Sequence, residues 1–508
     1  MSPGSRFGRR VIAVVAALAA AALALAGCSG SSARPGKLVI GVTTDANQLF
    51  PWKATQFQSV GVLQNIYGTL TEFDKDLKVV PGLAKSWHTS HGGKTLTLRL
   101  RQGVTFADGS RFDAADVKHS LDAIRDPKTA AVSASTLASV TKVTAPDAHT
   151  VQLTLSGPDA SLPSNLASVN MAMLSSKDSE KKLSARPNGT GPFAFDSRKP
   201  SQTLLLKRNA SYWGPRPQLD SVEFRVIPDD DSILSAMQAG NVQFAVFDDP
   251  VVGQTAEDLD LKVHKTSQLS YHTLQLNASR KKLSNVNTRL AIQCAVDRED
   301  VLDTAGFGQG EVTGPVTAPH YLSDPDDRPC PKRDLAKSAR YLHKAGLKSL
   351  TLKTIVSQGE YSTSVDEAQN LKSQLADAHI DLDLDVLESG AYVNKWVAAD
   401  FDAAVALNGG REDPDGMYGR YFTSKGNLNK VAGYSSPALD KLFAQGKAAT
   451  GVADRQPVYK KVGEELEDNA AWIWLFTGYT YTATTADVKG FTPLASGSLQ
   501  YLRTTSVT

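Results

Sequence analysis

The chain has 508 residues, which is enough for roughly two to four domains of ordinary size. Its formal net charge is +2, from 55 basic and 53 acidic side chains, so the charge does not favour binding to nucleic acid or to a broad membrane surface. Three cysteines are present, at positions 28, 294 and 330.

The chain begins with a segment that is typical of a secretory signal. Three arginines among the first ten residues precede an apolar run over residues 11–26, which is shorter than the roughly 20 residues of a membrane-spanning helix. The stretch Leu-Ala-Gly-Cys that ends at Cys28 resembles the lipobox of bacterial lipoproteins, whose cysteine is lipidated and becomes the first residue. A plain signal peptide followed by an unrelated cysteine is the alternative. We predict a signal peptide over residues 1–27 and lipidation of Cys28.

Lipidation would hold the protein outside the cytoplasm, at the outer face of the cytoplasmic membrane. Residues 28–36 are rich in Ser and Gly, and they predict a flexible tether with a reach of about 16 Å. A disordered terminus without a role would have the same composition. No second long apolar run follows, so we expect no transmembrane helix. Removal of the three signal-peptide arginines changes the net charge from +2 to −1.

Alternating apolar residues predict strands in the first half of the chain. These strands are expected over residues 37–43, 65–73, 95–101, 151–155 and 203–207. Asp113 is expected to cap a helix that ends before Pro127. The acidic run 229–231 precedes a helix over about 232–239, and we interpret it as capping that helix rather than as a metal site.

From Tyr271 onward, predicted strands and helices alternate, which favours an α/β lobe. Helices are expected over residues 288–304, 334–345, 366–378, 439–443 and 458–466, and strands over 350–356 and 380–387. Within the last strand, Asp381, Asp383 and Asp385 alternate with apolar residues, so we interpret them as its exposed face. A calcium loop would need Gly and Glu where Val386 and Tyr392 stand.

The sequence contains no recognisable catalytic or cofactor motif. It has no G-x-S-x-G nucleophile elbow, no P-loop and no dinucleotide fingerprint. His88 and His91 are three residues apart but have no Cys or acidic partner, which disfavours a zinc site. We therefore expect no catalytic residue, no metal and no cofactor.

Two further groups of residues leave alternatives open. Cys294 and Cys330 can pair in a disulfide outside the cytoplasm, or they can be two separate buried thiols. Trp472, Trp474 and Phe476 alternate, so an extended segment would place them on one side. That side could belong to a core, or it could form the wall of a cleft or the lining of a hinge.

One long stretch, GKTLTLRLRQGVTFADGSRFDAADVKHSL at residues 93–121, combines a strand with Leu-Arg-x-Gly-Val-x-Phe, Asp-Gly and Ala-x-Asp-Val before a helix. Further stretches are PGLAKSW at 81–87, NGTGPFAF at 188–195, YWGPRPQLDSVEFRVIPD at 212–229, RLAIQCAVDREDVL at 289–302, AKSARYLHKAGL at 336–347 and VKGF at 488–491. Together they resemble the extracellular solute-binding proteins of family 5, the peptide- and nickel-type receptors of ABC importers. The resemblance covers essentially the whole mature chain.

This resemblance implies an α/β fold, namely the two-lobed periplasmic-binding-protein-like fold of class II and the peptide-receptor type. The expected parts are lobe I at 37–266 with an extra subdomain at about 76–187, lobe II at 267–477, and a return to lobe I at 478–508. The two crossings between the lobes would fall near residues 265–277 and 472–481. Lobes of such receptors close over a ligand by a hinge motion.

The resemblance also points to the loop over residues 406–418, ALNGGREDPDGMY. In peptide receptors of the family, a Trp-containing loop presents an Asp that binds the ligand's α-amino group. That position falls on Gly410 here, or on Arg411 if the alignment moves by one residue, and the usual Trp is absent. Arg411 would repel an amine and favour a carboxylate. Glu412 or Asp413 would hold an amine only if the loop were placed differently.

The function implied by the resemblance is a lipid-anchored substrate-binding protein of an ABC importer, which is not an enzyme. It would capture oligopeptides or peptide-like solutes as a monomer and deliver them to permease and ATPase subunits. The alternatives are a receptor for a non-peptide solute, a ligand-sensing surface lipoprotein, and a hydrolase, which the missing nucleophile motifs disfavour. The expected ligand-binding residues are Asp45, Asn47, Tyr271, Asn408, Gly409, Gly410, Arg411 and Asp413.

Overall fold

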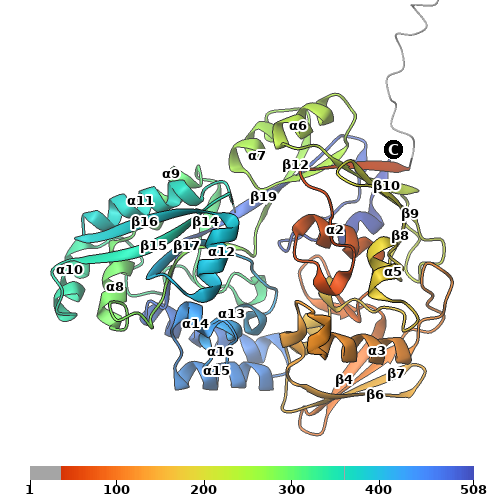
Figure 1. The fold of residues 1–508 in the computed structure, drawn as a ribbon, viewed down its shortest axis with the longest axis horizontal. Helices are drawn as coiled ribbons and strands as arrows, with labels where there is room; N and C mark the ends of the chain where they lie inside the picture. The colour runs from red at the N-terminus through yellow and green to blue at the C-terminus, as the bar shows by residue number, and fades with distance from the viewer. Residues whose placement is uncertain (1–35, 360) are drawn as a thin grey trace, which may run out of the picture.

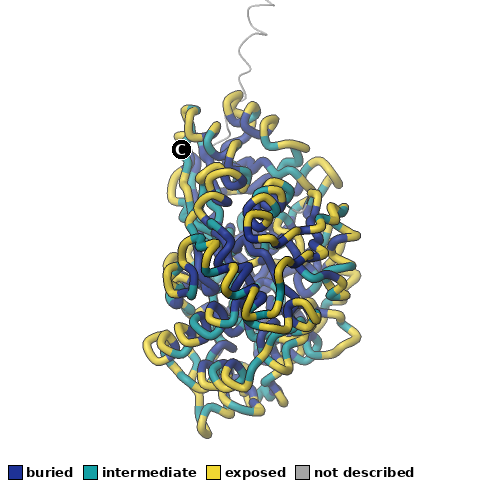
Figure 2. Tube along the Cα trace, turned by 90° about the vertical axis from the view of Figure 1, so that its left-hand side faces the viewer, coloured by how far each residue is buried: buried dark blue, intermediate teal, exposed yellow. Residues whose placement is uncertain are grey.

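The structure is a computed structural model that describes residues 36–359 and 361–508. The predicted signal peptide, Cys28 and the tether up to residue 35 lie outside the described residues. Two lobes stand side by side (Figure 1), and buried residues fill the interior while exposed residues follow the outer loops and helices (Figure 2). Within the described ranges, no helix combines the length and apolar character that crossing a bilayer requires.

The sheet of lobe I has eight strands and is built around β1 (Lys37–Val42). In spatial order its strands are β12 (Lys262–Ser267), β19 (Phe476–Thr484), β11 (Phe244–Phe247), β1, β10 (Ser221–Val226), β9 (Thr203–Arg208) and β8 (Phe193–Lys199), with β14 (Gly310–Val312) paired to β19. Strand β1 pairs in parallel with β10 and β11. Its inner positions are buried, as expected for a central strand with a continuous apolar run.

A separate antiparallel sheet lies in the part of lobe I that was predicted to be a subdomain. Its strands, in spatial order, are β4 (Ala84–Ser90), β5 (Thr95–Leu100), β7 (Thr150–Leu155) and β6 (Val140–Asp147). Helix α3 (Ala114–Arg125) packs on β6 and β7. Asp113 caps α3 by accepting a hydrogen bond from the Ala115 N–H at 2.7 Å, and Asp116 completes a capping box. The strands at 95–101 and 151–155 and the cap are therefore confirmed.

Further helices and two short strand pairs complete lobe I. They are α2 (Phe57–Ile66), α4 (Leu162–Asn165), α5 (Glu180–Ala185), α6 (Asp230–Gln238), α7 (Pro250–Glu257), and the strand pairs β2 (Thr71–Phe73) with β3 (Val79–Pro81) and β20 (Val488–Lys489) with β21 (Ser506–Val507). Asp229 caps α6 through the Ser232 N–H, which confirms the capping interpretation. The strand expected over residues 65–73 is wrong at its start, because Asn65 belongs to α2 and donates its side chain to the Gly61 carbonyl.

Lobe II is a five-stranded sheet covered by helices. Its strands, in spatial order, are β16 (Ile380–Glu388), β15 (Leu350–Gln358), β17 (Ala403–Asn408), β13 (Tyr271–Leu276) and β18 (Trp472–Trp474). Its helices are α8 (Val286–Ala295), α9 (Arg298–Ala305), α10 (Leu335–Lys344), α11 (Ser364–Ala376), α12 (Ser389–Ala398), α13 (Pro414–Phe422), α14 (Asn429–Ala432), α15 (Pro437–Ala448) and α16 (Val452–Asp468). Asp381, Asp383 and Asp385 are exposed on β16, as predicted.

The helix predicted over residues 288–304 is two helices in the structure. Asp297 lies between α8 and α9, and its side chain accepts a hydrogen bond from the Asp300 N–H, so it caps the second helix. Cys294 at the end of α8 is joined to Cys330 by a disulfide. The disulfide and the break between the helices together fix the chain where α8 ends.

The lobes are joined by two neighbouring chain segments. Strand β12 of lobe I leads into β13 of lobe II, and β18 of lobe II leads back into β19 of lobe I. Backbone hydrogen bonds link the segments at the crossing, from Gln268 N–H to the Gly478 carbonyl and from Leu475 N–H to the His272 carbonyl, both at 3.0 Å. Two paired segments of this kind form a hinge with few degrees of freedom.

The aromatic residues of the second crossing do not all share one side. Trp472 and Trp474 are fully buried in one apolar cluster of lobe II, beside Tyr418 and Phe422. Phe476 belongs to the other apolar cluster of the lobe, because the chain passes from β18 to β19 at Leu475 and the alternation stops there. The two tryptophans are therefore core residues, not the wall of a cleft.

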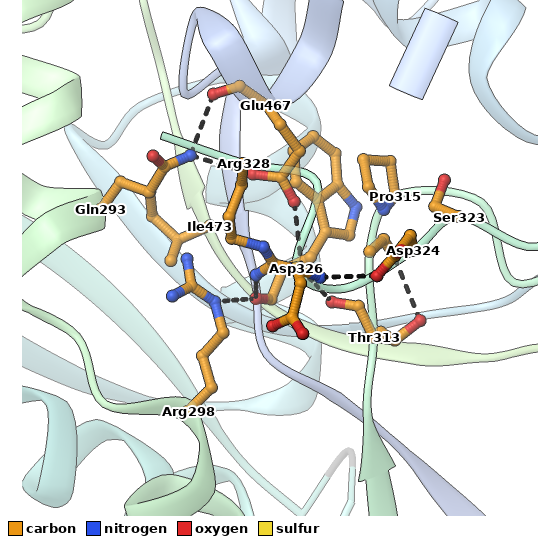
Figure 3. Close-up of polar contacts among 12 residues, drawn as sticks. Gln293, Arg298, Thr313, Pro315, Ser323, Asp324, Asp326, Arg328, Glu467 and Ile473 are labelled. Atoms are coloured by element: carbon orange, nitrogen blue, oxygen red, sulfur yellow. Dashed lines mark hydrogen bonds and ion pairs between the residues drawn. The ribbon is translucent and has the colours of Figure 1, made fainter. Parts of the chain in front are cut away.

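A buried polar cluster supports the same crossing (Figure 3). Arg298 and Arg328 both donate to the Trp474 carbonyl, at 2.8 and 3.4 Å. Arg328 also lies 3.4 Å from the carboxylate of Glu467, which accepts a hydrogen bond from Gln293 at 2.9 Å. Burial, together with the charge of Arg328, lowers the pKa of Arg298 to about 9. Two buried arginines thus hold the backbone just before the chain leaves lobe II.

Candidate functional site

A cavity of about 430 Å³, here called the central cavity, lies between the two lobes. Lobe I contributes α2 and β2, the loop at 190–192, the pair Tyr212 and Trp213, and the C-terminal segment 494–503. Lobe II contributes one continuous segment, residues 409–420, which includes the loop singled out in the sequence. A ligand in this cavity would contact both lobes at once.

Two further cavities continue along the interface. One of about 280 Å³ shares Ser496 with the first cavity, and another of about 300 Å³ shares Gln268 and Leu407 with the second. Both are lined by Asp230 and Asp248, and burial, together with the charge of Asp248, raises the pKa of Asp230 to about 6. The three cavities offer room for an extended ligand, and the second and third of them share an acidic wall.

Gly410 fixes the position of the loop in the cavity wall. The loop leaves β17 at Asn408, and at Gly410 it passes so close to the first crossing that an added Cβ would lie 1.8 Å from the Leu269 carbonyl oxygen. Gly409, one residue earlier, would place a Cβ in open space. The backbone of the ligand loop therefore rests directly on the hinge segment, and it can do so only because residue 410 has no side chain.

The carboxylate of Asp413 is not available to bind an amine. Its carboxylate accepts hydrogen bonds from both terminal nitrogens of Arg455, at 2.6 and 2.9 Å, and both side chains are buried. It also caps α13 by accepting from the Asp415 N–H at 3.0 Å. Arg455 is further bonded to the hydroxyls of Tyr321 and Tyr459. Asp413 is thus a structural residue that holds the loop to α16.

Arg411 and Arg420 are half-buried cations of this wall. Both line the cavity, and neither forms an ion pair or a side-chain hydrogen bond with any described residue. Burial, together with the positive charge of Arg420, lowers the pKa of Arg411. Glu412 lines the same wall, and burial raises its pKa. By contrast, Arg503 on the opposite wall is paired with Glu72 at 2.5 Å.

Four of the sequence-predicted site residues do not lie on the wall of this cavity. Asp45 is bonded to Arg198 at 2.8 Å and to the Ser201 N–H at 2.7 Å, and although burial acts to raise its pKa, these hydrogen bonds lower it. Asn47 is an exposed residue of the same loop of lobe I. Tyr271 and Asn408 are buried and bonded to each other at 3.1 Å, with Asn408 also bonded to Gln275.

The structure thus brings together Gly409, Gly410, Arg411 and Asp413 from the predicted set, with Asp413 in a supporting role. Sequence reasoning missed Arg420, which helix α13 turns toward Arg411. It also missed the cleft positions of Thr190 and Trp213, although both lie in stretches that carry the family resemblance. Those stretches were the available signal.

The lobes also touch beside the cavity. The Ala160 N–H of lobe I donates to the Lys447 carbonyl of lobe II at 2.9 Å, and Ser161 lies 3.5 Å from the carboxylate of Asp415. Lys447 lies 3.3 Å from the same carboxylate. Burial raises the pKa of Asp415 to about 6 despite the charge of Lys447, and the nearby acids Asp413 and Asp159 add to the shift. The lobes are therefore close together in this structure.

Among the described residues, no three His, Cys, Asp or Glu side chains are grouped in a way that could hold a metal ion. The arrangement offers hydrogen bonds and charges to a ligand, from two lobes that a hinge connects. Such a site binds a solute by differential contact with the two lobes rather than by chemistry.

Comparisons with known proteins bear on this arrangement. A model of the bacterial extracellular solute-binding proteins of family 5, for the middle region of that family, matches residues 78–429. The glutathione-binding protein GsiB of Escherichia coli strain K12 is 26% identical over 481 residues, which cover 89% of this chain and 91% of that protein.

Two solved structures have the same two-lobed fold. The periplasmic binding protein DppA from Helicobacter pylori, in complex with the peptide STSA, has a TM-score of 0.78 and 24% identity over 93% of this chain and 98% of that chain. The binding protein AgaA of A. tumefaciens R10, in complex with agropinic acid, has a TM-score of 0.80 and 24% identity over 93% of this chain and 99% of that chain.

Proposed function

The chain belongs to the bacterial extracellular solute-binding proteins of family 5, and from this premise we propose that it is a lipid-anchored receptor that captures peptides or peptide-like solutes. It is a substrate-binding protein of an ABC importer and not an enzyme. The observation that carries the proposal is the cavity between the lobes, whose wall comes from both lobes and includes a loop that rests on the hinge segment at Leu269.

Peptide-like solutes are supported by the relatives and by the length of the site. The relative GsiB is named for binding glutathione, and DppA was solved with a peptide. The three cavities along the interface share wall residues, so an extended ligand could lie through them. A second candidate is a receptor for an acidic solute that is not a peptide, and the unpaired Arg411 and Arg420 favour it.

We divide the chain into lobe I at 37–266 with a subdomain at about 76–187, lobe II at 267–477, and a return to lobe I at 478–508. The division is supported by the sheets, because β12 and β19 belong to the sheet of lobe I and β13 and β18 to the sheet of lobe II, and the proposed boundaries fall within two residues of the end of β12 and the start of β19. A ligand that contacts both lobes lowers the free energy of the closed form relative to the open form. The closed form would then be the one that permease and ATPase subunits recognise.

Anchoring through Cys28 would keep this receptor beside its permease, outside the cytoplasmic membrane. Two or more acyl chains give stable membrane attachment, where one gives marginal binding. The Ser- and Gly-rich residues after Cys28 would leave the body free to turn and dock. A sensor lipoprotein would share the anchor, and it differs from an importer receptor in having no neighbouring permease and ATPase genes.

Native mass spectrometry of the gently purified protein tests the proposed function. We expect bound ligand that is released on denaturation, as a heterogeneous set of short peptides. A single defined non-peptide mass would support the second candidate. Protein that carries no ligand, and that no solute of a broad peptide and organic-acid library stabilises, would contradict both.

A further inference from the structure

The wall of the central cavity carries two positive charges whose partners are missing. Three arginines line the cavity, and Arg503 is neutralised by Glu72 across a 2.5 Å ion pair. Arg411 and Arg420 have no carboxylate within ion-pair distance among the described residues. Buried or half-buried cations without a counter-ion are unfavourable unless something else supplies the negative charge.

The acidic side chains of the wall do not provide that charge. The carboxylate of Asp413 is paired with Arg455 through both of its oxygens, and the carboxylate of Glu72 is paired with Arg503. Glu412 remains, and it makes no ion pair with either neighbouring arginine. Even with Glu412 ionised, two positive charges face one negative charge, so the wall keeps a surplus of positive charge.

The side chains of both arginines lie against helix α13 or its residues. The guanidinium of Arg420 lies over the ring of Tyr421, 4.7 Å from its centre, and its Nε is buried without an acceptor. The side chain of Arg411 lies against α13, where its Cδ would be 3.4 Å from a Cβ added to Gly416. Both arginines come from one segment that Asp413 and Arg455 hold to the body of lobe II.

We propose that Arg411 and Arg420 bind a carboxylate of the ligand, so that the ligand's acidic group, and not its amine, is anchored at this loop. The proposal rests on the proposed function and names the chemical class of the ligand. Guanidinium groups present donors in the planar geometry that a carboxylate accepts. The C-terminal carboxylate of a short peptide and the carboxylate of a non-peptide acid would use the same anchor.

At positions 410 and 413, the same loop offers no place for an amine. Residue 410 has no side chain and cannot gain one, because the Leu269 carbonyl occupies the position of a Cβ. The carboxylate of Asp413 is buried and bonded on both oxygens. An ammonium group placed beside Arg411 and Arg420 would meet two like charges at close range.

A first experiment needs no ligand. We expect Arg411→Gln to raise the thermal midpoint of the ligand-free protein, because it removes a half-buried charge next to a second one. Arg503 lines the same cavity but is paired with Glu72, so Arg503→Gln breaks an ion pair and should lower the thermal midpoint. A lower midpoint for Arg411→Gln would mean that the protein already neutralises this charge, and it would overturn the proposal.

A second experiment uses a panel of defined probes, namely trialanine, its C-terminal amide, N-acetyltrialanine, glutathione and glutarate. Calorimetry should detect binding of the free acids, including the N-acetyl peptide, and a loss of at least about tenfold in affinity for the amide. Arg420→Gln should lower the affinity for the free acids by a similar factor. Arg340→Gln, on helix α10, should leave this affinity unchanged. An amide that binds as well as its acid, or no binding of any acid, would overturn the proposal.

The outcomes separate this proposal from the proposed function. If peptide amides bind and N-acetylation abolishes binding, the protein is still a receptor but its anchor is for an amine. Binding of trialanine and its N-acetyl derivative identifies a peptide carboxylate as the source of the charge. Binding of glutarate without binding of either peptide acid identifies a non-peptide acid. Release of uncharged ligands alone in native mass spectrometry would refute the anchor and leave the receptor function intact.

Discussion

Arg455 holds Asp413 through two hydrogen bonds, of 2.6 and 2.9 Å, in a buried pair that joins helix α16 to the start of helix α13. We expect Asp413→Asn to lower the free energy of unfolding by about 3–5 kcal/mol, because Arg455 would remain buried without its counter-charge. Urea denaturation measures this change. Asp383→Asn, on the exposed face of β16, is the control and should stay within about 0.5 kcal/mol.

The same variant separates a structural Asp413 from an amine anchor. Asparagine can still cap α13, so the folded fraction of Asp413→Asn should keep its preference among ligands. Unchanged stability together with lost peptide binding would show that Asp413 contacts the ligand instead.

Adjacent glycines in the ligand loop provide a matched pair of variants. Gly410→Ala would drive a Cβ into the Leu269 carbonyl, so the loop and Arg411 must move away from the hinge segment. Gly409→Ala meets no atom within 4 Å and should be tolerated. We expect Gly410→Ala to lose at least about tenfold in ligand affinity and to fall in thermal midpoint, with Gly409→Ala close to the parent. Equal effects of both variants would argue against the close approach.

The contact between the lobes predicts a pH dependence of stability. The folded pKa of Asp415 is about 6, above its usual 3.8, so the folded state binds this proton more tightly than the unfolded state does. The stabilisation is complete below about pH 4 and is lost as the pH rises through 6. Asp415→Asn should therefore gain roughly 2–3 kcal/mol relative to the parent between pH 4 and pH 8.

Asp440 provides the opposite sign as a control. A hydrogen bond from Ser424 lowers the pKa of Asp440. The ionised carboxylate of Asp440 therefore stabilises the folded state at neutral pH, and this stabilisation is lost as the pH falls. Asp440→Asn should lose stability relative to the parent as the pH rises. If Asp415→Asn followed that same trend, the carboxylate of Asp415 would be ionised in the folded protein at all these pH values.

The disulfide between Cys294 and Cys330 closes a segment with a sequence separation of 36 residues. From loop-closure entropy, we expect its removal in a Cys294→Ala, Cys330→Ala double variant to lower the free energy of unfolding by about 4 kcal/mol. Reducing agent should lower the free energy of unfolding of the parent protein by a similar amount and leave that of the double variant unchanged. Reaction of both thiols in the native, unreduced protein would contradict the bond.

The anchor makes a prediction that concerns location. Cys28→Ala should release the protein from the membrane fraction into the medium, because the acyl chains would have no attachment point. Ligand affinity of the released protein should equal that of a detergent-solubilised parent, since the binding cavity lies wholly in residues 60–503. Retention of the variant on the membrane would argue for a different anchor.

Local patterns explain why much of the fold could be predicted from the sequence. The strand over 95–101 and the exposed face of β16 could be predicted because apolar and polar residues alternate along each of them. Asp297 shows the limit, because a capping residue inside a long helical pattern looks like one more helical residue until its side chain is placed. Phe476 was assigned to the side of the tryptophans because the sequence does not show where a strand changes sheets.

The candidate site depended on contacts between distant residues. The family motif located Gly410 and Arg411, but the partner that removes Asp413 from the site is 42 residues away on another helix. Asp45 was predicted to bind ligand, and its carboxylate proves to be held by Arg198, 153 residues further on. Arg420 had no local signal, because its approach to Arg411 depends on the direction in which α13 leaves the loop.

Strand β19 lies between β12 and β11 in the sheet of lobe I, although it is the last long strand of the chain. During synthesis, the ribosome therefore releases every other strand of that sheet before the one that fills its gap. A nascent chain that lacks residues 476–508 has an interrupted first lobe with two unpaired strand edges. The sheet of lobe I can therefore be completed only after residues 476–484 have left the ribosome.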